Sequence, residues 1–186
     1  VTVVTQQRME DQNMRNVDLL VHVVRGFDNP TLPTPPDPVR DEKAFNDEIL
    51  LLDLGVLEKR VERMKKESKK GPEFDVTKKC LEHVETGEPL RTLALAEEEQ
   101  KALGPGIQLL SQTPIITLYN LSEQAWSDPA NAALREVRRG KQSASMAICG
   151  AIEAEIAAMP AADQKEFLDG LGLGEPARNV FIRAAY

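Results

Sequence analysis

The sequence has few of the residues that would assign it to a specialised class of protein. Only 4% of its 186 residues are aromatic, and it contains two histidines and two cysteines. Cys80 and Cys149 lie far apart and lack metal-ligand spacing, so we predict two reduced thiols, as in a cytosolic protein, and no metal site. No apolar run approaches the roughly 20 residues of a membrane span. A metal or thiol enzyme is therefore the least favoured class.

The chain also lacks a general excess of positive charge. Its 23 Lys and Arg residues are outnumbered by 30 Asp and Glu residues, which gives a formal net charge of −7 at pH 7. This balance argues against non-specific binding of nucleic acid over the whole surface of the protein, although a local basic patch is still compatible with it. The hydrophobic fraction of 41% and the charged fraction of 28% predict a soluble globular protein of one domain, or one domain with an appendage.

The most informative stretch is residues 114–123, which read PIITLYNLSE. An apolar run without charge ends abruptly in polar residues, as in a buried parallel strand whose C-terminal end delivers polar groups to a ligand crevice. Asn120 and Glu123 resemble the base-reading Asn-Lys-x-Asp motif of P-loop GTPases, with the final Asp lengthened to Glu. An Asn and a Glu in a strand-to-helix loop are more often a cap or solvated, so the interpretation depends on the surrounding sequence.

The rest of the chain alternates between strand and helix patterns. Strands are predicted at residues 1–5, 17–25 and 144–148, with a proline-rich loop at 28–38, and helices at 41–70, 74–85, 95–103, 131–139, 153–156, 161–169 and 177–185. His22 lies inside a strand pattern, where a packed core histidine is favoured over a catalytic one. The alternation predicts an α/β protein with a parallel sheet and an inserted antiparallel helical hairpin joined at Gly71-Pro72.

This hairpin carries a local excess of positive charge. Residues 58–79 contain nine basic and five acidic side chains. The apolar face of the first helix narrows past Val56, which predicts a helix that is buried at its start and projects at its end. A solvated helical face is the commoner meaning of such a run. The alternative is RNA or ribosome contact through four lysines at the tip, Lys65, Lys66, Lys69 and Lys70.

Short segments along the chain together resemble one family. They read HVVRGF at 22–27, DPVRD at 37–41, GEPLR at 87–91, NLSE at 120–123, GAIEAEI at 150–156 and IRAAY at 182–186. In this order they resemble the YchF, or Obg-like ATPase, family of P-loop NTPases. The resemblance covers residues 13–186.

The resemblance implies a Ras-like nucleotide-binding domain interrupted by a helical arm. It assigns G-domain strands and the proline-rich loop to residues 1–40, the coiled-coil arm to 41–90, the second half of the nucleotide-binding domain to 91–160, and a lead-in to a TGS domain to 161–186. It implies a cytoplasmic, ribosome-associated protein that binds and hydrolyses ATP, and often GTP, with Mg²⁺. The Gly-x-x-x-x-Gly-Lys-Ser/Thr loop is not in this sequence, and neither is an Asp-x-x-Gly switch that follows a strand. The letters Asp-x-x-Gly occur at residues 169–172, at the end of a predicted helix. We therefore expect Mg²⁺ ligands outside this chain, no catalytic residue within it and no hydrolysis by it alone.

The family's base-binding residues correspond to Asn120, Leu121, Glu123, Cys149, Gly150 and Ala151. Guanine offers two donors that an Asp carboxylate accepts as a fork, whereas adenine offers an acceptor at N1. The longer side chain of Glu123 would displace that fork and admit adenine. Asn120 would hold the loop and contact the purine edge, Leu121 would lie near the base, and backbone N–H groups of residues 149–151 would close the pocket.

Three features depart from the family pattern. Tyr119 stands where small or apolar residues are usual, and its phenol needs a polar partner. The first 12 residues lack the family's glycine-rich approach to the first strand, and the loop at 29–36 is rich in proline and lacks the usual His. The alternative function is a nucleotide-independent module in which the basic arm binds RNA or the ribosome and the sheet is only a scaffold.

Overall fold

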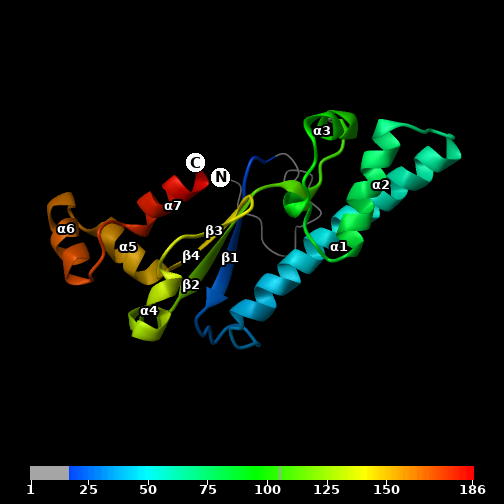
Figure 1. Ribbon diagram of the computed structural model, residues 1–186. Coiled ribbons are helices and arrows are strands. Elements are labelled where there is room, and N and C mark those ends of the chain that lie inside the picture. The colour runs from blue at the N-terminus through cyan, green and yellow to red at the C-terminus, as the bar shows by residue number, and fades with distance from the viewer. Residues whose placement is uncertain (1–16, 105) are drawn as a thin grey trace. The chain divides into compact units, whose positions relative to one another are not determined.

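The computed structural model describes residues 17–104 and 106–186, which belong to two compact units (Figure 1). Unit 1 comprises Val1–Leu20 and Lys43–Pro114, and unit 2 comprises Val21–Glu42 and Ile115–Tyr186. The strand predicted at residues 1–5 lies outside the described residues. Within the part of the chain that is described, none of the helices combines the length and apolar character that a membrane span requires.

The strands form a four-stranded mixed sheet. Strands β1 (Leu20–Gly26), β2 (Ile115–Leu121), β3 (Arg138–Gly140) and β4 (Ser143–Ile148) are arranged in the order β1-β2-β4-β3. β2 and β4 are parallel, whereas β3 pairs antiparallel with β4. β1 and β2 start together, because Leu20 N donates to Pro114 O at 2.8 Å. The predicted α/β class is confirmed, but the purely parallel sheet is wrong at β3.

The helix predicted at residues 131–139 is also wrong. A 3-10 segment, η5 (Pro129–Leu134), is followed by the edge strand β3. Ala132, which the helical stripe would bury, is exposed. A two-residue turn pairs Gly140 with Ser143, with Gln142 at a φ of 51°. Pairing with the buried strand β4 therefore overrides a helical pattern of only three small or branched apolar residues.

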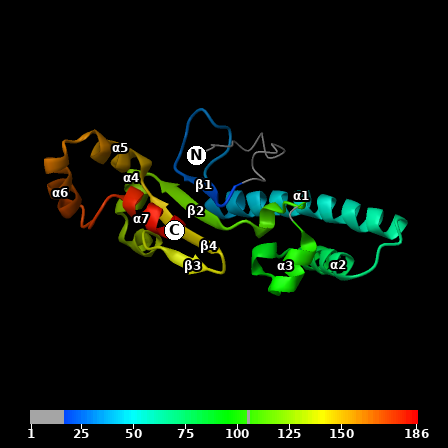
Figure 2. The same cartoon turned by 90° about the horizontal axis from the view of Figure 1, so that it is seen from above.

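Unit 1 is built around the predicted helical hairpin. Helices α1 (Pro38–Lys66) and α2 (Pro72–Glu85) run antiparallel and side by side, as Figures 1 and 2 both show. The hairpin turns at Gly71-Pro72 as predicted, with Gly71 at a φ of 113°. α2 begins at Pro72, two residues before the predicted start at residue 74, because proline is well suited to the first turn of a helix. Arg60 of α1 and Glu73 of α2 form a 2.8 Å ion pair across the hairpin.

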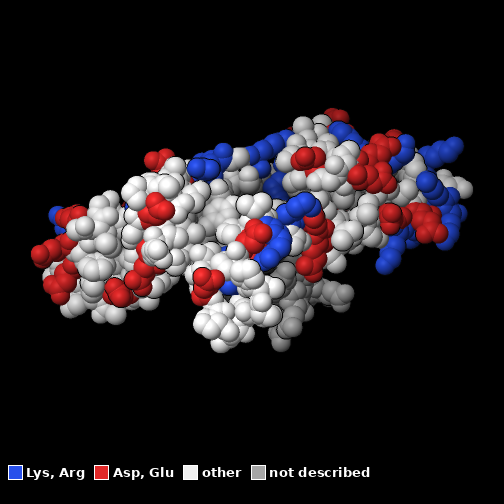
Figure 3. All heavy atoms as spheres, turned by 90° about the horizontal axis from the view of Figure 1, so that it is seen from below, with Lys and Arg blue, Asp and Glu red and all other residues white. Residues whose placement is uncertain are grey.

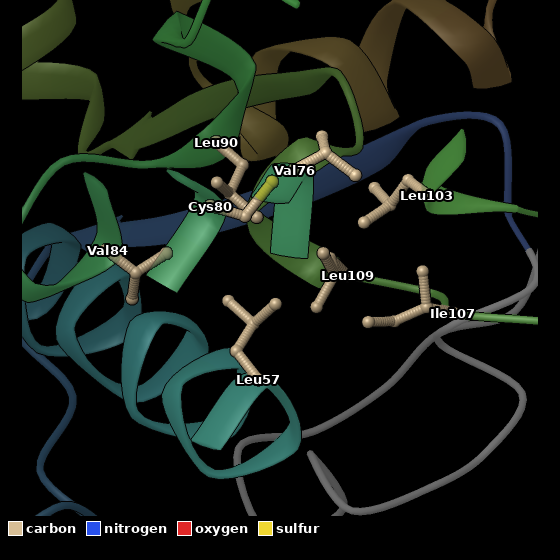
Figure 4. Close-up of a cluster of buried hydrophobic side chains, with 8 residues drawn as sticks. All are labelled: Leu57, Val76, Cys80, Val84, Leu90, Leu103, Ile107 and Leu109. Carbon is tan, nitrogen blue, oxygen red and sulfur yellow. The ribbon is translucent and has the colours of Figure 1, made fainter. Parts of the chain in front are cut away.

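A continuous apolar core joins the hairpin to the segments that follow it. The cluster in Figure 4 comprises Leu57 of α1, Val76, Cys80 and Val84 of α2, Leu103 of α3 (Glu97–Leu103), and Leu90, Ile107 and Leu109. Beyond Val56, the buried positions of α1 form one stripe, Leu57, Val61 and Met64. The wide face therefore narrows as predicted, and the remaining stripe is still packed at Met64.

A buried polar network lies beside this core. Asp53 of α1 is fully buried and accepts hydrogen bonds from Leu110 N at 2.9 Å and Ser111 N at 2.7 Å. Arg91, 5% exposed, donates to Ser111 O at 3.3 Å. Burial lowers the pKa of Arg91, and the nearby charge of Asp53 opposes that shift. The network holds α1, η3 (Leu90–Thr92) and η4 (Leu110–Gln112) together.

Both cysteines are free thiols, as predicted. Cys80 is fully buried in α2, and Cys149 is 2% exposed after β4. Burial raises the pKa of Cys80 to about 11, so this thiol stays protonated and unreactive at neutral pH.

Candidate nucleotide-base site

The candidate site lies in unit 2, where two parallel strands end level with each other. Asn120 of β2 is opposite Ile148 of β4. β2 leads into α4 (Glu123–Ser127), and β4 leads into α5 (Gly150–Ala158). Two helices therefore start at one edge of the sheet, the edge at which open α/β sheets bind their ligands.

A hydrogen bond joins the two predicted loops directly. The Oδ1 atom of Asn120 accepts from Gly150 N at 2.9 Å. A Cβ atom at position 150 would lie 3.2 Å from Oδ1 and 3.3 Å from Nδ2 of Asn120. Gly150 thus permits the side chain of Asn120 to approach its backbone closely, and a larger residue at position 150 would crowd that side chain. Because Oδ1 accepts from a backbone N–H, the amide orientation of Asn120 is defined and Nδ2 is available to donate to a ligand.

The helix cap at this edge is provided by Ser122. Its Oγ accepts from Ala125 N at 3.1 Å, and Glu123 is the first residue of α4. Glu123 is exposed, at a helix start where a carboxylate is favoured. Ser122 therefore caps α4, and neither Asn120 nor Glu123 does. The exposure of Glu123 is compatible with the other alternative, a solvated loop residue.

The other predicted residues are divided between the core and the surface. The side chains of Leu121 and Cys149 are 9% and 2% exposed, in a cluster with Trp126, Ala147, Ile152, Ile156 and Leu168. They can contact a ligand only through their backbone. Ala151 is exposed in the first turn of α5. The structure thus brings Asn120 and Gly150 into contact and leaves Glu123 and Ala151 accessible.

Sequence reasoning missed the polar partner of Tyr119. The phenol donates to Oε2 of Glu42, near the start of α1, at 2.6 Å, and Thr117 donates to Oε1 of the same carboxylate at 3.4 Å. Burial and the hydrogen bond to Glu42 raise the pKa of Tyr119, so the phenol remains a donor. The two residues are 77 positions apart, and no local pattern connects them.

His22, predicted to be a core histidine, is half-buried on β1. Burial lowers its pKa, and the charges of Glu42 and Asp41 oppose that shift.

The four predicted RNA-contact lysines lie at the far end of the hairpin. Lys65, Lys66, Lys69 and Lys70 are all exposed, and Figure 3 shows Lys and Arg side chains gathered over this end. Lys66 pairs with Glu62 at 2.7 Å and Lys69 with Glu67 at 3.6 Å. The tip is therefore solvated and only partly neutralised by its own acids.

Comparison with known proteins finds several relatives with one name. No family model matches the chain. The chain is 34% identical over 186 residues to the ribosome-binding ATPase YchF of Bacillus subtilis (strain 168). This alignment covers 94% of this chain and 50% of that protein. It is 32% identical over 183 residues to the protein of the same name from Escherichia coli O157:H7, with the same coverage. Over 94% of its length the chain is thus similar to proteins of the YchF family. It spans about half the length of these curated relatives.

A solved YchF structure has the same fold. The YchF GTPase of Schizosaccharomyces pombe aligns with a TM-score of 0.73 and 22% identity, over 92% of this chain and 50% of that one. The YchF resemblance drawn from short motifs is thus confirmed. The roles assigned to Asn120 and Glu123 stay predictions.

Proposed function

We propose that this chain supplies the base-recognition part of a ribosome-associated YchF protein that binds and hydrolyses ATP, and also GTP. The observation that carries the proposal is the hydrogen bond between Asn120 and Gly150 at the level ends of β2 and β4. The names of the curated relatives, ribosome-binding ATPases, support the activity and the partner. A ribosome partner would place the protein in the cytoplasm.

The base would lie between the start of α4 and the start of α5. Asn120 holds the two loops together and offers Nδ2 to the purine edge. Gly150 N is already bonded to Asn120, so we assign the backbone contact at the start of α5 to the next donor, Ala151 N. Glu123 reaches one methylene further than an Asp would, which weakens the guanine fork and admits adenine.

The phosphates require other parts of the full-length protein. The sequence contains no Gly-x-x-x-x-Gly-Lys-Ser/Thr loop, so we assign phosphate and Mg²⁺ binding to residues outside this chain and expect no hydrolysis by the chain alone. In this proposal the sheet belongs to a Ras-like P-loop domain, residues 1–40 and 91–160 contribute to that domain, residues 41–90 are its arm, and residues 161–186 lead to a TGS domain.

Asn120→Ala should weaken ATP and GTP binding alike. The substitution removes a base contact and the bond that orders Gly150, which together correspond to about 1–2 kcal/mol, or roughly 5- to 30-fold in Kd. The measurement is titration of each nucleotide with Mg²⁺ into the full-length protein. Asn179→Ala, on α7 (Ala177–Ala185), is the control and should leave both Kd values unchanged. Wild-type affinities in Asn120→Ala would reject the proposed site.

A second candidate function is a nucleotide-independent RNA or ribosome-binding module. The exposed basic end of the hairpin favours it. Reversing the charge of Lys65, Lys66, Lys69 and Lys70 should reduce co-sedimentation with ribosomes and flatten its salt dependence. The slope of the logarithm of the binding constant against the logarithm of the salt concentration should become smaller in magnitude by about 0.7–0.9 for each phosphate that these lysines no longer neutralise.

The control reverses four exposed cations away from the tip of the arm, Lys43, Lys101, Lys165 and Arg178, and so changes the net charge equally. Ribosome binding that survives in the arm variant would make the four lysines a solvated face. Loss of binding in both variants would show a response to net charge alone.

A further inference from the structure

A second concentration of positive charge lies in unit 2. The nine Lys and Arg residues of that unit are Arg25, Arg40, Arg135, Arg138, Arg139, Lys141, Lys165, Arg178 and Arg183. Four of these nine fall within the short segment 135–141, which contains one acid, Glu136. Such a concentration in an acidic protein calls for a local explanation, because scattered cations would serve solubility equally well.

Three of these cations lie on the hairpin formed by β3 and β4. Arg138 and Arg139 are in β3 and Lys141 is in the turn, and we call these three residues the basic hairpin. β3 is the last strand in the order of the described sheet, and all three side chains are exposed. The turn is tight, because Gly140 pairs with Ser143 and a Cβ atom on Gly140 would come within 2.6 Å of Ser143 Oγ. The strand pairing therefore holds the three cations on a fixed backbone.

The fourth cation has a structural role. Arg135 lies 4.9 Å from the centroid of the Trp126 ring and donates to Trp126 O. Arg139, in contrast, gives one hydrogen bond to Arg183 O at 3.1 Å and remains exposed. Among the ion pairs of residues 17–104 and 106–186, none includes Arg138 or Arg139.

We propose that the basic hairpin binds the phosphate backbone of RNA. Successive side chains of a strand point to opposite faces, so Arg138 and Arg139 present guanidinium groups on both sides of a narrow edge. This arrangement suits phosphates on two sides of the hairpin, and each guanidinium can bind a phosphate as a fork. The choice of RNA as the polyanion rests on the proposed ribosome partner.

Other occupants fit the basic hairpin less well. An acidic peptide that adds to a sheet edge depends on a row of main-chain hydrogen bonds, and β3 has only three residues. Base stacking is not provided either, because Trp126 is 7% exposed and Arg135 lies over its ring. The contact would therefore depend on charge and backbone shape rather than on base sequence.

The test is binding of the full-length protein to a labelled RNA stem-loop over a range of KCl concentrations. Replacing Arg138, Arg139 and Lys141 with Glu should lower the log–log salt slope by about 2–3 and weaken binding at least tenfold near 0.1 M salt. A second variant, Arg138→Gln with Lys141→Gln, keeps the Arg139–Arg183 contact and should lower the slope by about 1–2. The control reverses the charges of Lys101, Lys165 and Arg178. It should change the salt slope and the RNA affinity less than the triple variant of the basic hairpin does.

The outcomes separate this inference from the proposed function. An unchanged salt slope in both hairpin variants overturns the inference, as does an equal loss in the control or no RNA binding by the wild type. Polyglutamate serves as a probe for an acidic peptide. The inference is also overturned if the hairpin variants lose polyglutamate binding but bind RNA as the wild type does. ATP affinity and the effect of the arm lysines, measured on the same preparations, report on the proposed function independently.

Discussion

Replacing Asp53 with alanine should lower the free energy of unfolding by about 3–5 kcal/mol, because it removes one partner from a buried charged network. The carboxylate is fully buried and accepts from Leu110 N and Ser111 N. Without it, two buried backbone donors lose their acceptor, and the guanidinium of Arg91, 5% exposed, loses its counter-charge. Truncation to alanine also leaves a cavity beside the apolar core.

Urea unfolding of the chain, followed by circular dichroism, measures this effect. Asp47→Ala is the matched control on the same helix, because Asp47 is exposed and pairs with Lys43 on the surface. The control should change stability by less than about 0.5 kcal/mol. A similar small loss for both variants would show that Asp53 is not the centre of the network.

Asp53 also shows what could not be predicted from the sequence. Its two hydrogen-bond partners are 57 and 58 residues away, and a single acid among leucines on a long helix normally faces solvent. The hydrogen bond between Tyr119 and Glu42 could not be predicted from the sequence for the same reason. Both depend on how distant segments are placed, which local periodicity does not encode.

Local pattern was sufficient where the sequence carries a strong signal of its own. The apolar run at residues 114–119 predicted β2, and Gly71-Pro72 predicted the turn between α1 and α2. It failed at residues 131–139, where a short edge strand has little apolar character of its own and follows its neighbour.

At the candidate site, the family resemblance selected Asn120 and Gly150, and the structure joins them by a hydrogen bond. The same resemblance could not separate side-chain from backbone roles. The burial of the Leu121 and Cys149 side chains follows from the packing of the strand ends against α5 and Trp126.

Glu123→Asp should increase GTP affinity of the full-length protein by about one to two decades. If the extra methylene of Glu123 carries its carboxylate past the guanine donors, the shorter Asp restores part of the pair of hydrogen bonds to guanine N1–H and the 2-amino group. Each recovered charge-assisted hydrogen bond contributes roughly 1.5–3 kcal/mol. Adenine offers no such donors at N1, so ATP affinity should stay level or fall.

The local structure makes this substitution informative. Glu123 is exposed, Ser122 provides the cap of α4, and Asp is as well suited as Glu to the first turn of a helix. The change should therefore leave the fold intact. Glu155→Asp, an exposed position of α5, makes the same chemical change away from the strand ends and is the matched control.

The most direct test of base recognition at this site is the ratio of GTP to ATP Kd values, measured for wild type, Glu123→Asp and Glu155→Asp at one magnesium and salt concentration. Base reading by Glu123 predicts that the ratio moves toward GTP by at least about tenfold in Glu123→Asp alone. A ratio that is the same in all three proteins would contradict it and would make Glu123 a solvated loop residue.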